Sequence, residues 1–340
     1  MSERSWSYVI IFLASFLLSY LITPLVGFIA TAFKIIDKPA ENKLHAKSTP
    51  RLGGVAMFIS YSVPVLLING FDHGARTILL GGFLILIIGI VDDIRRVSAV
   101  YKLILIFAVT LLLARQGIGL KLFHDLPVIN FFLTLLWIAG VTSAFNAVDN
   151  MDGLAAGLAF ISAAAFFVIA LRTSQWALAG LSAALIGSTL GFLRYNFHPA
   201  KIFMGDSGSL FLGFTFASLG VMGEWSENPV KASIIPILVL GVPIFDLVYI
   251  VTRRWFDGVT KGIIEAITFC AKDHLSHRLI FLGLNQRKAA LFIYLVSICI
   301  SIGAVVLQNA AKTDAILLFV QFVLTFATIL IIISLTRKLK

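Results

Sequence analysis

The stretch YVIIFLASFLLSYLITPLVGFIATAF, residues 8–33, has no charged side chain over 26 consecutive positions. An apolar helix of about 20 residues is long enough to cross the hydrocarbon core of a bilayer. The stretch is longer than the apolar part of a removable signal peptide, and it does not end in a small-residue cleavage signal. It therefore predicts a helix that spans a membrane.

The rest of the chain repeats this pattern. Of its 340 residues, 59% are hydrophobic and 13% are charged, and the mean hydropathy is +0.98. This composition excludes a soluble globular protein of the same length. Apolar segments occur at residues 8–33, 52–69, 76–91, 100–116, 130–148, 153–172, 175–194, 208–223, 232–252, 289–308 and 314–336. We predict an all-α polytopic integral membrane protein with about 11 transmembrane helices, formed by one domain over residues 1–340.

The basic residues predict the orientation of these helices. If the N-terminus lies outside, the inner loops and the C-terminal tail hold 20 of the 27 Lys and Arg residues. Basic residues accumulate in cytoplasmic loops, so we predict an outer N-terminus and a cytoplasmic C-terminus. The longest inner loop, residues 253–288, is too short for a soluble domain.

The formal net charge of +10 has more than one explanation. It follows from this topology, it attracts anionic lipid, or it gathers an anionic substrate. Nucleic acid is disfavoured as a partner, because the basic residues are spread over short segments without a basic helix or an aromatic platform. Cys270 and Cys299 have neither the spacing of a disulfide framework nor neighbouring zinc ligands.

Two carboxylates end the third apolar segment, in VDDIRR at residues 91–96. Asp92 and Asp93 would face the negative end of the helix dipole, which is unfavourable unless a cation compensates. They suit Mg²⁺ shared with a phosphate, because Mg²⁺ binds one or two carboxylates plus substrate oxygens. The alternative is that both are plain boundary residues.

A second acidic cluster, NAVDNMDGLAAG at residues 146–157, joins two apolar segments. Asn146, Asp149 and Asp152 recur at intervals of three residues, which places the first two on one helical face. Asp152 could instead cap the following helix. Together, the three side chains favour a site at the membrane boundary.

The segment KIFMGDSGSLFLGFT, residues 201–215, contains GDSGS, which is close to the GDSGG around the nucleophile of trypsin-like serine proteases. That nucleophile requires a β-barrel and a His and an Asp brought to it, whereas this segment opens an apolar helix. We therefore predict that Ser207 is not a nucleophile and that Ser207 or Asp206 caps the helix. We expect Gly205 and Gly208 to let an anionic ligand come close.

Two further features lie towards the C-terminus. Asp246 is deep in the ninth apolar segment, where an unpaired carboxylate is costly, so it is either functional or paired. KDHLSHR, residues 272–278, places His274 and His277 three apart, without the glutamate of a His-Glu-x-x-His metalloprotease motif. Two imidazoles followed by Arg278 suit a diphosphate, which Arg can bind through two parallel hydrogen bonds.

The inner segment DKPAENKLHAKSTPRLGG, residues 37–54, adds donors and a pair of glycines that would let the backbone approach a ligand. Its donors are Lys43, His45, Lys47 and Arg51. Inner carboxylates surrounded by Lys, Arg and His point to a metal-bridged diphosphate at the membrane surface. The alternative is a transporter of anionic solutes, which would place its polar residues near the middle of the membrane.

Five separated motifs resemble those of the polyprenyl-phosphate N-acetylhexosamine-1-phosphate transferases, over almost the whole chain. They are KLHAKSTPRLGG, VDDIRR, NAVDNMDGLAAG, NFHPAKIFMGDSGSLFLG and DHLSHRL. The resemblance implies transfer of a sugar 1-phosphate from a UDP-sugar to a polyprenyl phosphate such as undecaprenyl phosphate, with release of UMP, to start a cell-envelope polysaccharide. It further implies Mg²⁺ as the cofactor, which Mn²⁺ could replace, and an active site on the cytoplasmic face of the bacterial inner membrane.

The resemblance also implies roles for individual residues. The catalytic carboxylates would be Asp92, Asp93, Asp149 and Asp206, and the metal ligands would be Asp206 and Asp93. Phe203 matches an aromatic residue that stacks on uracil. The remaining substrate-binding residues would be Lys43, His45, Lys47, Arg96, Asn146, Asp152, Asn196, His274, His277 and Arg278. A homodimer is compatible with this assignment.

Two departures from the family pattern bear on the sugar. Members that use UDP-MurNAc-pentapeptide have three consecutive histidines, whereas this chain has His-Leu-Ser-His. Arg95 and Arg96 stand where that branch often has a lysine. The resemblance therefore favours UDP-GlcNAc, with phospho-MurNAc-pentapeptide transfer as the alternative within the family.

Overall fold

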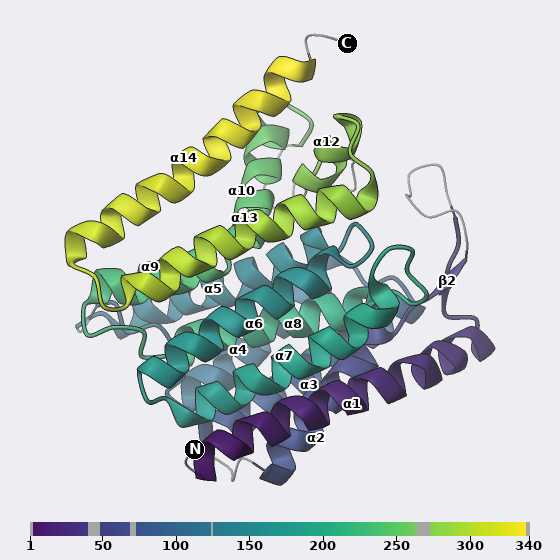
Figure 1. Ribbon diagram of the computed structural model, residues 1–340, viewed down its shortest axis with the longest axis horizontal. Coiled ribbons are helices and arrows are strands. Elements are labelled where there is room, and N and C mark those ends of the chain that lie inside the picture. Colours follow the sequence, from purple (N-terminus) through teal and green to yellow (C-terminus); the bar gives the residue numbers. More distant parts are fainter. Residues whose placement is uncertain are drawn as a thin grey trace.

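In the computed structural model, the chain forms a bundle of helices (Figure 1). The structure describes residues 3–39, 48–68, 73–123, 125–260, 262, 265 and 273–337. The helices are α1 (Glu3–Ala32), α2 (Gly53–Ile68), α3 (His73–Ile94), α4 (Ala99–Arg115), α5 (Pro127–Val148), α6 (Leu154–Arg172), α7 (Trp176–Asn196), α8 (Gly205–Met222), α9 (Pro229–Val239), α10 (Gly241–Phe256), α12 (Leu275–Phe281), α13 (Gln286–Leu307) and α14 (Lys312–Arg337). A short antiparallel pairing joins β1 (Ile36–Asp37) to β2 (Thr49–Pro50).

The apolar composition explains why these segments are helical, because a helix satisfies every backbone group within hydrocarbon. In the described part of the chain, seven helices are long and apolar enough to cross a membrane, and the bent pair α9–α10 would make eight. This confirms a helical multi-pass membrane protein.

The number of crossings stays a prediction. Each of the eleven apolar segments coincides with a helix or with the bent pair. However, α2 has 16 residues and α4 has 17, which is shorter than the roughly 20 residues of a typical span. α8 begins with the polar sequence GDSGS. The orientation of the bundle likewise stays a prediction.

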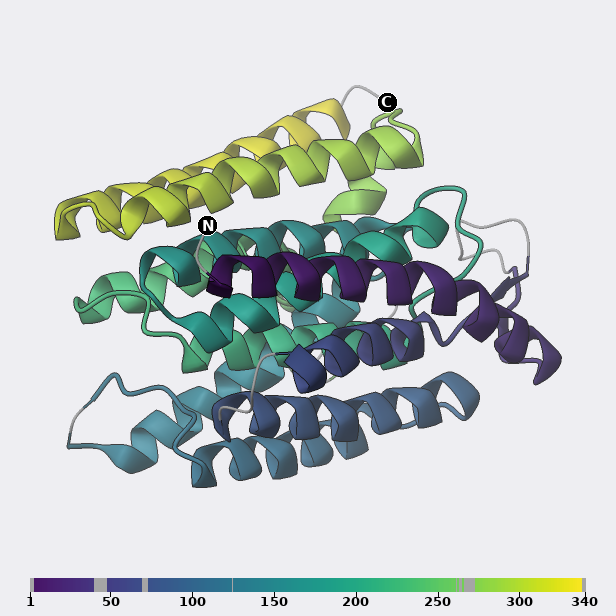
Figure 2. The same ribbon diagram turned by 60° about the horizontal axis from the view of Figure 1, so that its bottom comes forward.

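The helices pack around α8. It contacts α3 and α5 extensively, while α7 packs against α1 and α6. Figure 2 shows α13 and α14 along one side of the bundle and α3 and α4 along the opposite side. Phe211, Phe214 and Phe216 of α8 are fully buried. The core therefore runs along α8, which begins at the GDSGS segment.

Close backbone contacts fix the start of α8. A Cβ on Gly54 of α2 would lie 2.1 Å from Gly208 N, and a Cβ on Gly89 of α3 would lie 2.3 Å from Ser207 Cα. Only glycine allows helices to approach this closely. Gly54 and Gly208 thus serve helix packing, where we expected both to face a ligand.

The ninth apolar segment is broken into α9 and α10, which meet at an 80° bend. Ser162 Oγ on α6 donates to Val239 O at 3.1 Å, which satisfies a carbonyl group next to the break. Beyond the bend, α10 runs at a steep angle to its neighbours and leads towards α12 (Figure 1). The bend thereby places Asp246 near the predicted histidine motif.

Candidate active site

Asp93, near the end of α3, caps the start of α8. Its Oδ1 accepts the Asp206 N–H at 2.9 Å, and its Oδ2 accepts the Ser207 N–H at 3.1 Å. The first N–H groups of a helix have no intrahelical partner and form the positive end of its dipole. Asp93 lies at the negative end of the α3 dipole, and the positive end of the α8 dipole compensates for this. Gly205 is required beside it, because a Cβ there would lie 2.4 Å from Asp93 Oδ2.

This arrangement corrects two expectations, one about the cap of α8 and one about Gly205. The N-cap of α8 is Met204, without a side-chain cap of its own, so neither Asp206 nor Ser207 caps the helix. Gly205 makes room for Asp93, where we expected it to admit a ligand. Both oxygens of Asp93 accept backbone N–H groups, so Asp93 caps the helix, and its role as a metal ligand stays a prediction.

Ser207 is fully buried, and its Oγ donates to Met204 O at 3.2 Å. A nucleophilic serine needs a base that accepts its proton. A backbone carbonyl is not such a base. The geometry therefore agrees with the prediction that Ser207 is not a nucleophile.

Lys102, in the first turn of α4, links two of the predicted carboxylates. Its Nζ forms ion pairs with Asp92 and, at 2.5 Å, with Asp206 Oδ2. Asp92 Oδ1 also accepts the Val97 N–H at 2.5 Å. Sequence reasoning missed Lys102, although a signal exists. A cation in the first turn of a helix faces the positive end of the dipole, which is unfavourable without an anionic partner.

α5 brings Asn146 and Asp149 to the same end of the bundle. Asn146 Nδ2 donates to Ser209 Oγ on α8 at 2.9 Å, and Asp149 directly follows the last residue of α5. Burial raises the pKa of Asp149 well above its ordinary value, and the charges of Asp206 and Asp93 raise it further. A cation bound among these three carboxyl groups would favour their charged forms.

The donor set fits a divalent cation that is bound jointly with a substrate. Asp92 and Asp206 already share one cationic group, the ammonium of Lys102. Among the residues that the structure describes, no three His, Cys, Asp or Glu side chains are placed to hold a metal by themselves. Mg²⁺ usually takes one or two carboxylates plus phosphate oxygens, and Asp206 with Asp92 would meet that need.

Asp152 and Asn196 hold the loop that precedes α8. Asp152 Oδ2 lies 2.8 Å from His198 Nδ1 and accepts the Ala200 N–H at 3.0 Å, while α6 has no side-chain cap. Asn196 is buried, and its Nδ2 donates to Ile202 O at 2.9 Å. Both residues thus have partners within the protein, and their contacts with substrate stay predictions. The alternative that Asp152 caps α6 is wrong.

A strap formed by residues 49–54 lies beside the same loop. The Phe203 N–H donates to Pro50 O at 2.9 Å, and the Gly53 N–H donates to Phe203 O at 3.0 Å. Arg51 pairs with Asp37 at 2.6 Å. Phe203 is partly exposed. The strap therefore fixes the backbone of Phe203 two residues before α8 begins.

Four of the predicted substrate-binding residues take no described part in this arrangement. Lys43, His45 and Lys47 lie outside the described residues, so their roles stay predictions. Arg96 is exposed, two residues beyond the end of α3.

α12 carries the predicted histidine motif and is held by ion pairs. Asp246 Oδ2 on α10 lies 2.7 Å from His274 Nδ1, and its Oδ1 accepts the Leu275 N–H at 2.8 Å. Arg254 donates twice to Asp273, at 2.8 and 2.7 Å. Asp246 is thus paired, which was one of the two roles that its depth in the ninth segment allowed.

The same helix is tied to the turn after α5. Ser276 Oγ donates to Asn150 Oδ1 at 2.6 Å. His277 is buried, with its Nδ1 3.3 Å from Ser276 Oγ. Arg278 Nε donates to Asp273 O at 2.8 Å. The histidine motif therefore lies near the acidic turn, but His277 and Arg278 also have partners within the protein.

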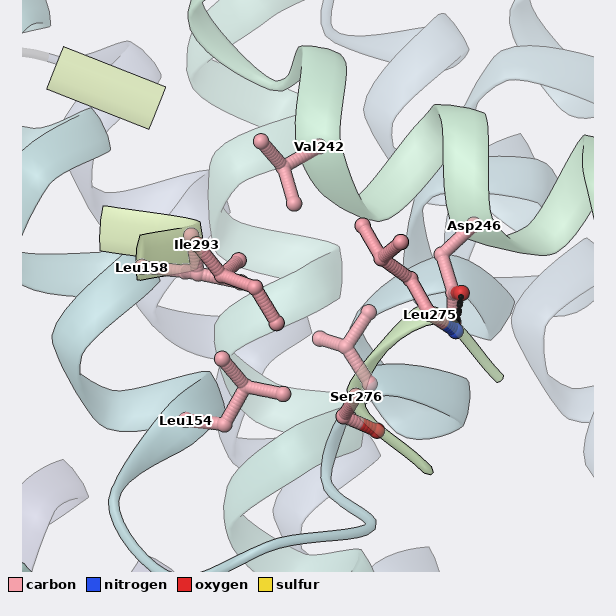
Figure 3. A pocket seen from close by; sticks show the side chains of 8 residues that line it. Leu154, Leu158, Val242, Asp246, Leu275, Ser276 and Ile293 are labelled. Carbon is pink, nitrogen blue, oxygen red and sulfur yellow. Dashed lines mark hydrogen bonds between the residues drawn. The ribbon is translucent and has the colours of Figure 1, made fainter. Parts of the chain in front are cut away.

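A small cavity of about 10 Å³ lies next to α12. Figure 3 shows the side chains that line it, and a dashed line marks the hydrogen bond from the Leu275 N–H to Asp246. The lining residues are Val148, Leu154, Leu158, Val242, Asp246, Leu275, Ser276 and Ile293. A cavity of this volume has room for about one water molecule. It is too small for an organic substrate. The candidate site is the polar surface around Asp206, where Lys102 pairs with two carboxylates.

The described polar residues come from the ends of α3, α4, α5, α8, α10 and α12. Apart from Asp246, they lie in the first or last turn of a helix or directly beside it, and hydrogen bonds join α3, α4 and α5 to α8 and α10 to α12. A transporter would place such residues near the middle of the membrane. The arrangement therefore favours chemistry at a membrane surface.

Comparison with known proteins identifies the family. Residues 75–224, which include the carboxylates from Asp92 to Asp206, match the model of glycosyl transferase family 4. A protein of Bacillus subtilis (strain 168) named "Probable undecaprenyl-phosphate N-acetylglucosaminyl 1-phosphate transferase" is 38% identical over 333 residues, covering 95% of this chain and 91% of the relative.

Two more distant relatives extend the comparison. The decaprenyl-phosphate N-acetylglucosaminephosphotransferase of Mycolicibacterium smegmatis is 32% identical over 331 residues, covering 86% of this chain and 80% of the relative. A phospho-N-acetylmuramoyl-pentapeptide-transferase of Heliobacterium modesticaldum is 31% identical over 242 residues, covering 65% of this chain and 75% of the relative. With such similarity over nearly its whole length, the chain belongs to glycosyl transferase family 4.

Proposed function

We propose that this protein transfers N-acetylglucosamine 1-phosphate from UDP-N-acetylglucosamine to undecaprenyl phosphate or a related polyprenyl phosphate, with release of UMP. The observation that carries the proposal is the Lys102 ammonium between Asp92 and Asp206 at the start of α8. Carboxylates gathered around a cation suit diphosphate chemistry, because the cation is shared between the protein and the phosphates. The Bacillus and Mycolicibacterium relatives support the choice of substrates by their names.

In the proposed reaction, an oxygen of the lipid phosphate attacks the β-phosphorus of the UDP-sugar. A new phosphorus–oxygen bond forms, the bond from the β-phosphorus to the bridging oxygen breaks, and that oxygen leaves with UMP. The two reactants are both anionic and repel each other. Catalysis therefore consists mainly of positioning and of neutralising charge.

The residues at the start of α8 supply these two effects. Lys102 would bring positive charge to the reacting phosphates, with Asp92 and Asp206 orienting its ammonium group. Asp93 holds the first turn of α8, and thereby Asp206, in place through two hydrogen bonds. Mg²⁺ or Mn²⁺ held by Asp206 with Asp92 would neutralise the diphosphate and polarise its phosphorus–oxygen bonds.

The nucleotide would contact the elements around this centre. We assign stacking on uracil to Phe203, because it is partly exposed and the strap fixes its backbone close to Asp206. Contacts with the nucleotide and diphosphate fall to Asn146, Asp149 and His274, at the end of α5 and the start of α12.

We also propose which sugar is transferred and in which membrane the protein lies. N-acetylglucosamine is favoured by the His-Leu-Ser-His sequence and by the names of the two relatives that cover most of the chain. We place the protein in the bacterial inner membrane with its site on the cytoplasmic face, because the inner loops hold most of the basic residues. A homodimer stays a prediction.

The test is release of UMP by the purified protein with undecaprenyl phosphate, Mg²⁺ and one UDP-sugar at a time. We expect UMP with UDP-GlcNAc, none with UDP-MurNAc-pentapeptide, and none after the divalent cation is removed with EDTA. Release with UDP-MurNAc-pentapeptide alone would assign the protein to the other branch of the family. No UMP with any UDP-N-acetylhexosamine would refute the proposal.

A further inference from the structure

Asp246 and His274 form a buried pair that does more than hold α12. Their side chains are 5% and 10% exposed, and Asp246 Oδ2 lies 2.7 Å from His274 Nδ1. We propose that Asp246 is a positioning residue that fixes the His274 ring with a proton on Nδ1 and leaves Nε2 for the diphosphate of the UDP-sugar. This inference deepens the proposed function and rests on it.

The chemistry of the pair decides which ring nitrogen can meet a ligand. An ionised carboxylate only accepts hydrogen bonds, so His274 Nδ1 is the donor to Asp246. Nε2 is then the nitrogen that remains for another partner. In the neutral ring with its proton on Nδ1, Nε2 carries a lone pair, so it donates to an anion only after it binds a second proton. The Asp246 carboxylate stabilises the charge of that protonated ring and fixes its orientation.

A helix cap alone would not require a carboxylate. The Leu275 N–H at the start of α12 needs one acceptor, which Asp246 Oδ1 supplies at 2.8 Å, and an amide oxygen would serve equally. The second oxygen of Asp246 goes to the His274 ring. Burying a carboxylate is costly unless it is fully paired, so an acid kept within a bent span points to a role for its charge.

Contacts on both sides of His274 hold it near the acidic turn. Asp273, the preceding residue, receives two hydrogen bonds from Arg254. Ser276 Oγ donates to Asn150 Oδ1 at 2.6 Å, next to Asp149. The His274 ring therefore cannot leave this end of the bundle unless ion pairs and hydrogen bonds break.

The test compares variants of the full-length protein by release of UMP from UDP-GlcNAc. Asp246→Asn keeps an oxygen for the Leu275 N–H but places an amide donor opposite His274 Nδ1, which reverses the tautomer and removes the charge that stabilises the protonated ring. His274→Gln removes the ring. We expect each change to lower kcat/KM about 10- to 100-fold, as when a carboxylate partner that orients a histidine is lost. The double variant should be no slower than the slower single variant, because both changes remove one interaction.

Asp257→Asn is the matched control. Asp257 also pairs with a basic side chain beside α10, Arg253, but its side chain is 55% exposed. We expect this variant to keep the wild-type kcat/KM. A second readout is nuclear magnetic resonance of isotope-labelled histidine. Without substrate, His274 should carry its proton on Nδ1 in the wild type and on Nε2 in Asp246→Asn, and UDP-GlcNAc with Mg²⁺ should shift the wild-type Nε2 signal.

Several results would overturn the inference and leave the proposed function standing. They are a wild-type kcat/KM in Asp246→Asn, losses that add in the double variant, or a wild-type Nε2 signal that UDP-GlcNAc leaves unchanged. The last of these decides the matter even if Asp246→Asn does not fold. A wild-type protein that releases no UMP would instead refute the proposed function, and with it the ligand assigned to His274.

Discussion

The positive charge of Lys102 interacts unfavourably with its own helix, because a cation in the first turn of α4 lies at the positive end of the helix dipole. Ion pairs with Asp92 and Asp206 compensate for this. The two carboxylates would otherwise repel each other. At the scale of single residues, these three groups therefore stabilise one another only as a set.

Replacing Lys102 with Met should lower kcat for UMP release by about 10²- to 10³-fold, the loss typical of removing one electrostatic stabiliser. Lys102→Arg keeps the charge and should keep more activity. Lys121→Met, at an exposed lysine between α4 and α5, is the control and should behave as the wild type. A wild-type kcat in Lys102→Met would remove Lys102 from the catalytic centre.

Asp206 and Ser207 are adjacent, but we expect only Asp206 to be needed for activity. Asp206→Asn should abolish turnover and leave the protein folded, because a neutral amide neither pairs with the Lys102 charge nor replaces a carboxylate ligand. Ser207→Ala should keep substantial activity and lose about 0.5–1.5 kcal/mol of stability with its hydrogen bond to Met204 O. Steady-state UMP release and thermal unfolding measure both effects. An inactive Ser207→Ala beside an active Asp206→Asn would show that the metal-site assignment is wrong.

At the scale of elements, three helices converge on the start of α8. Asp93 of α3 accepts two of its N–H groups, Gly54 of α2 touches its backbone, and Asn146 of α5 donates to Ser209. The position of Asp206 therefore depends on contacts that no local sequence contains.

Gly89→Ala should disturb this packing, because its Cβ would lie 2.3 Å from Ser207 Cα. Overpacking of this kind costs about 1–3 kcal/mol or more. Gly82→Ala in the same helix is the matched control, since its Cβ would meet the Phe211 ring at 3.5 Å and the Phe58 ring at 3.7 Å, which are ordinary van der Waals distances. Alanine favours a helix over glycine by about 1 kcal/mol, so Gly82→Ala should be neutral or stabilising. Equal thermal stability of the two variants would show that α3 does not need this close approach.

The helices themselves were predictable from the length of their apolar segments, but their irregularities were not. The 80° bend between α9 and α10 is accompanied by a hydrogen bond from Ser162 to Val239, 77 positions apart. The sequence indicated that the negative charge of Asp93 is unfavourable at the C-terminal end of its own helix. Its partner at α8 is 113 positions away and could be found only once the fold was known.

In the whole molecule, hydrogen bonds join polar residues of six helices and of the turn after α5. The motifs predicted most members of this set, because charged residues beside apolar segments are costly without a purpose. They did not predict which members hold the protein backbone in place. Asp152 and Asn196 hold a loop, and this division depends on pairings between distant segments.

The fate of the β-phosphate of UDP-GlcNAc decides whether the protein transfers a sugar 1-phosphate. Transfer of a sugar 1-phosphate moves the β-phosphorus to the lipid, whereas transfer of the sugar alone leaves it in UDP. With a radioactive β-phosphate and undecaprenyl phosphate, we predict that the label enters the lipid in an amount equal to the UMP released, and that Asp206→Asn prevents both. Label recovered in UDP, or a glycosylated lipid without label, would show that the sugar is transferred without its phosphate.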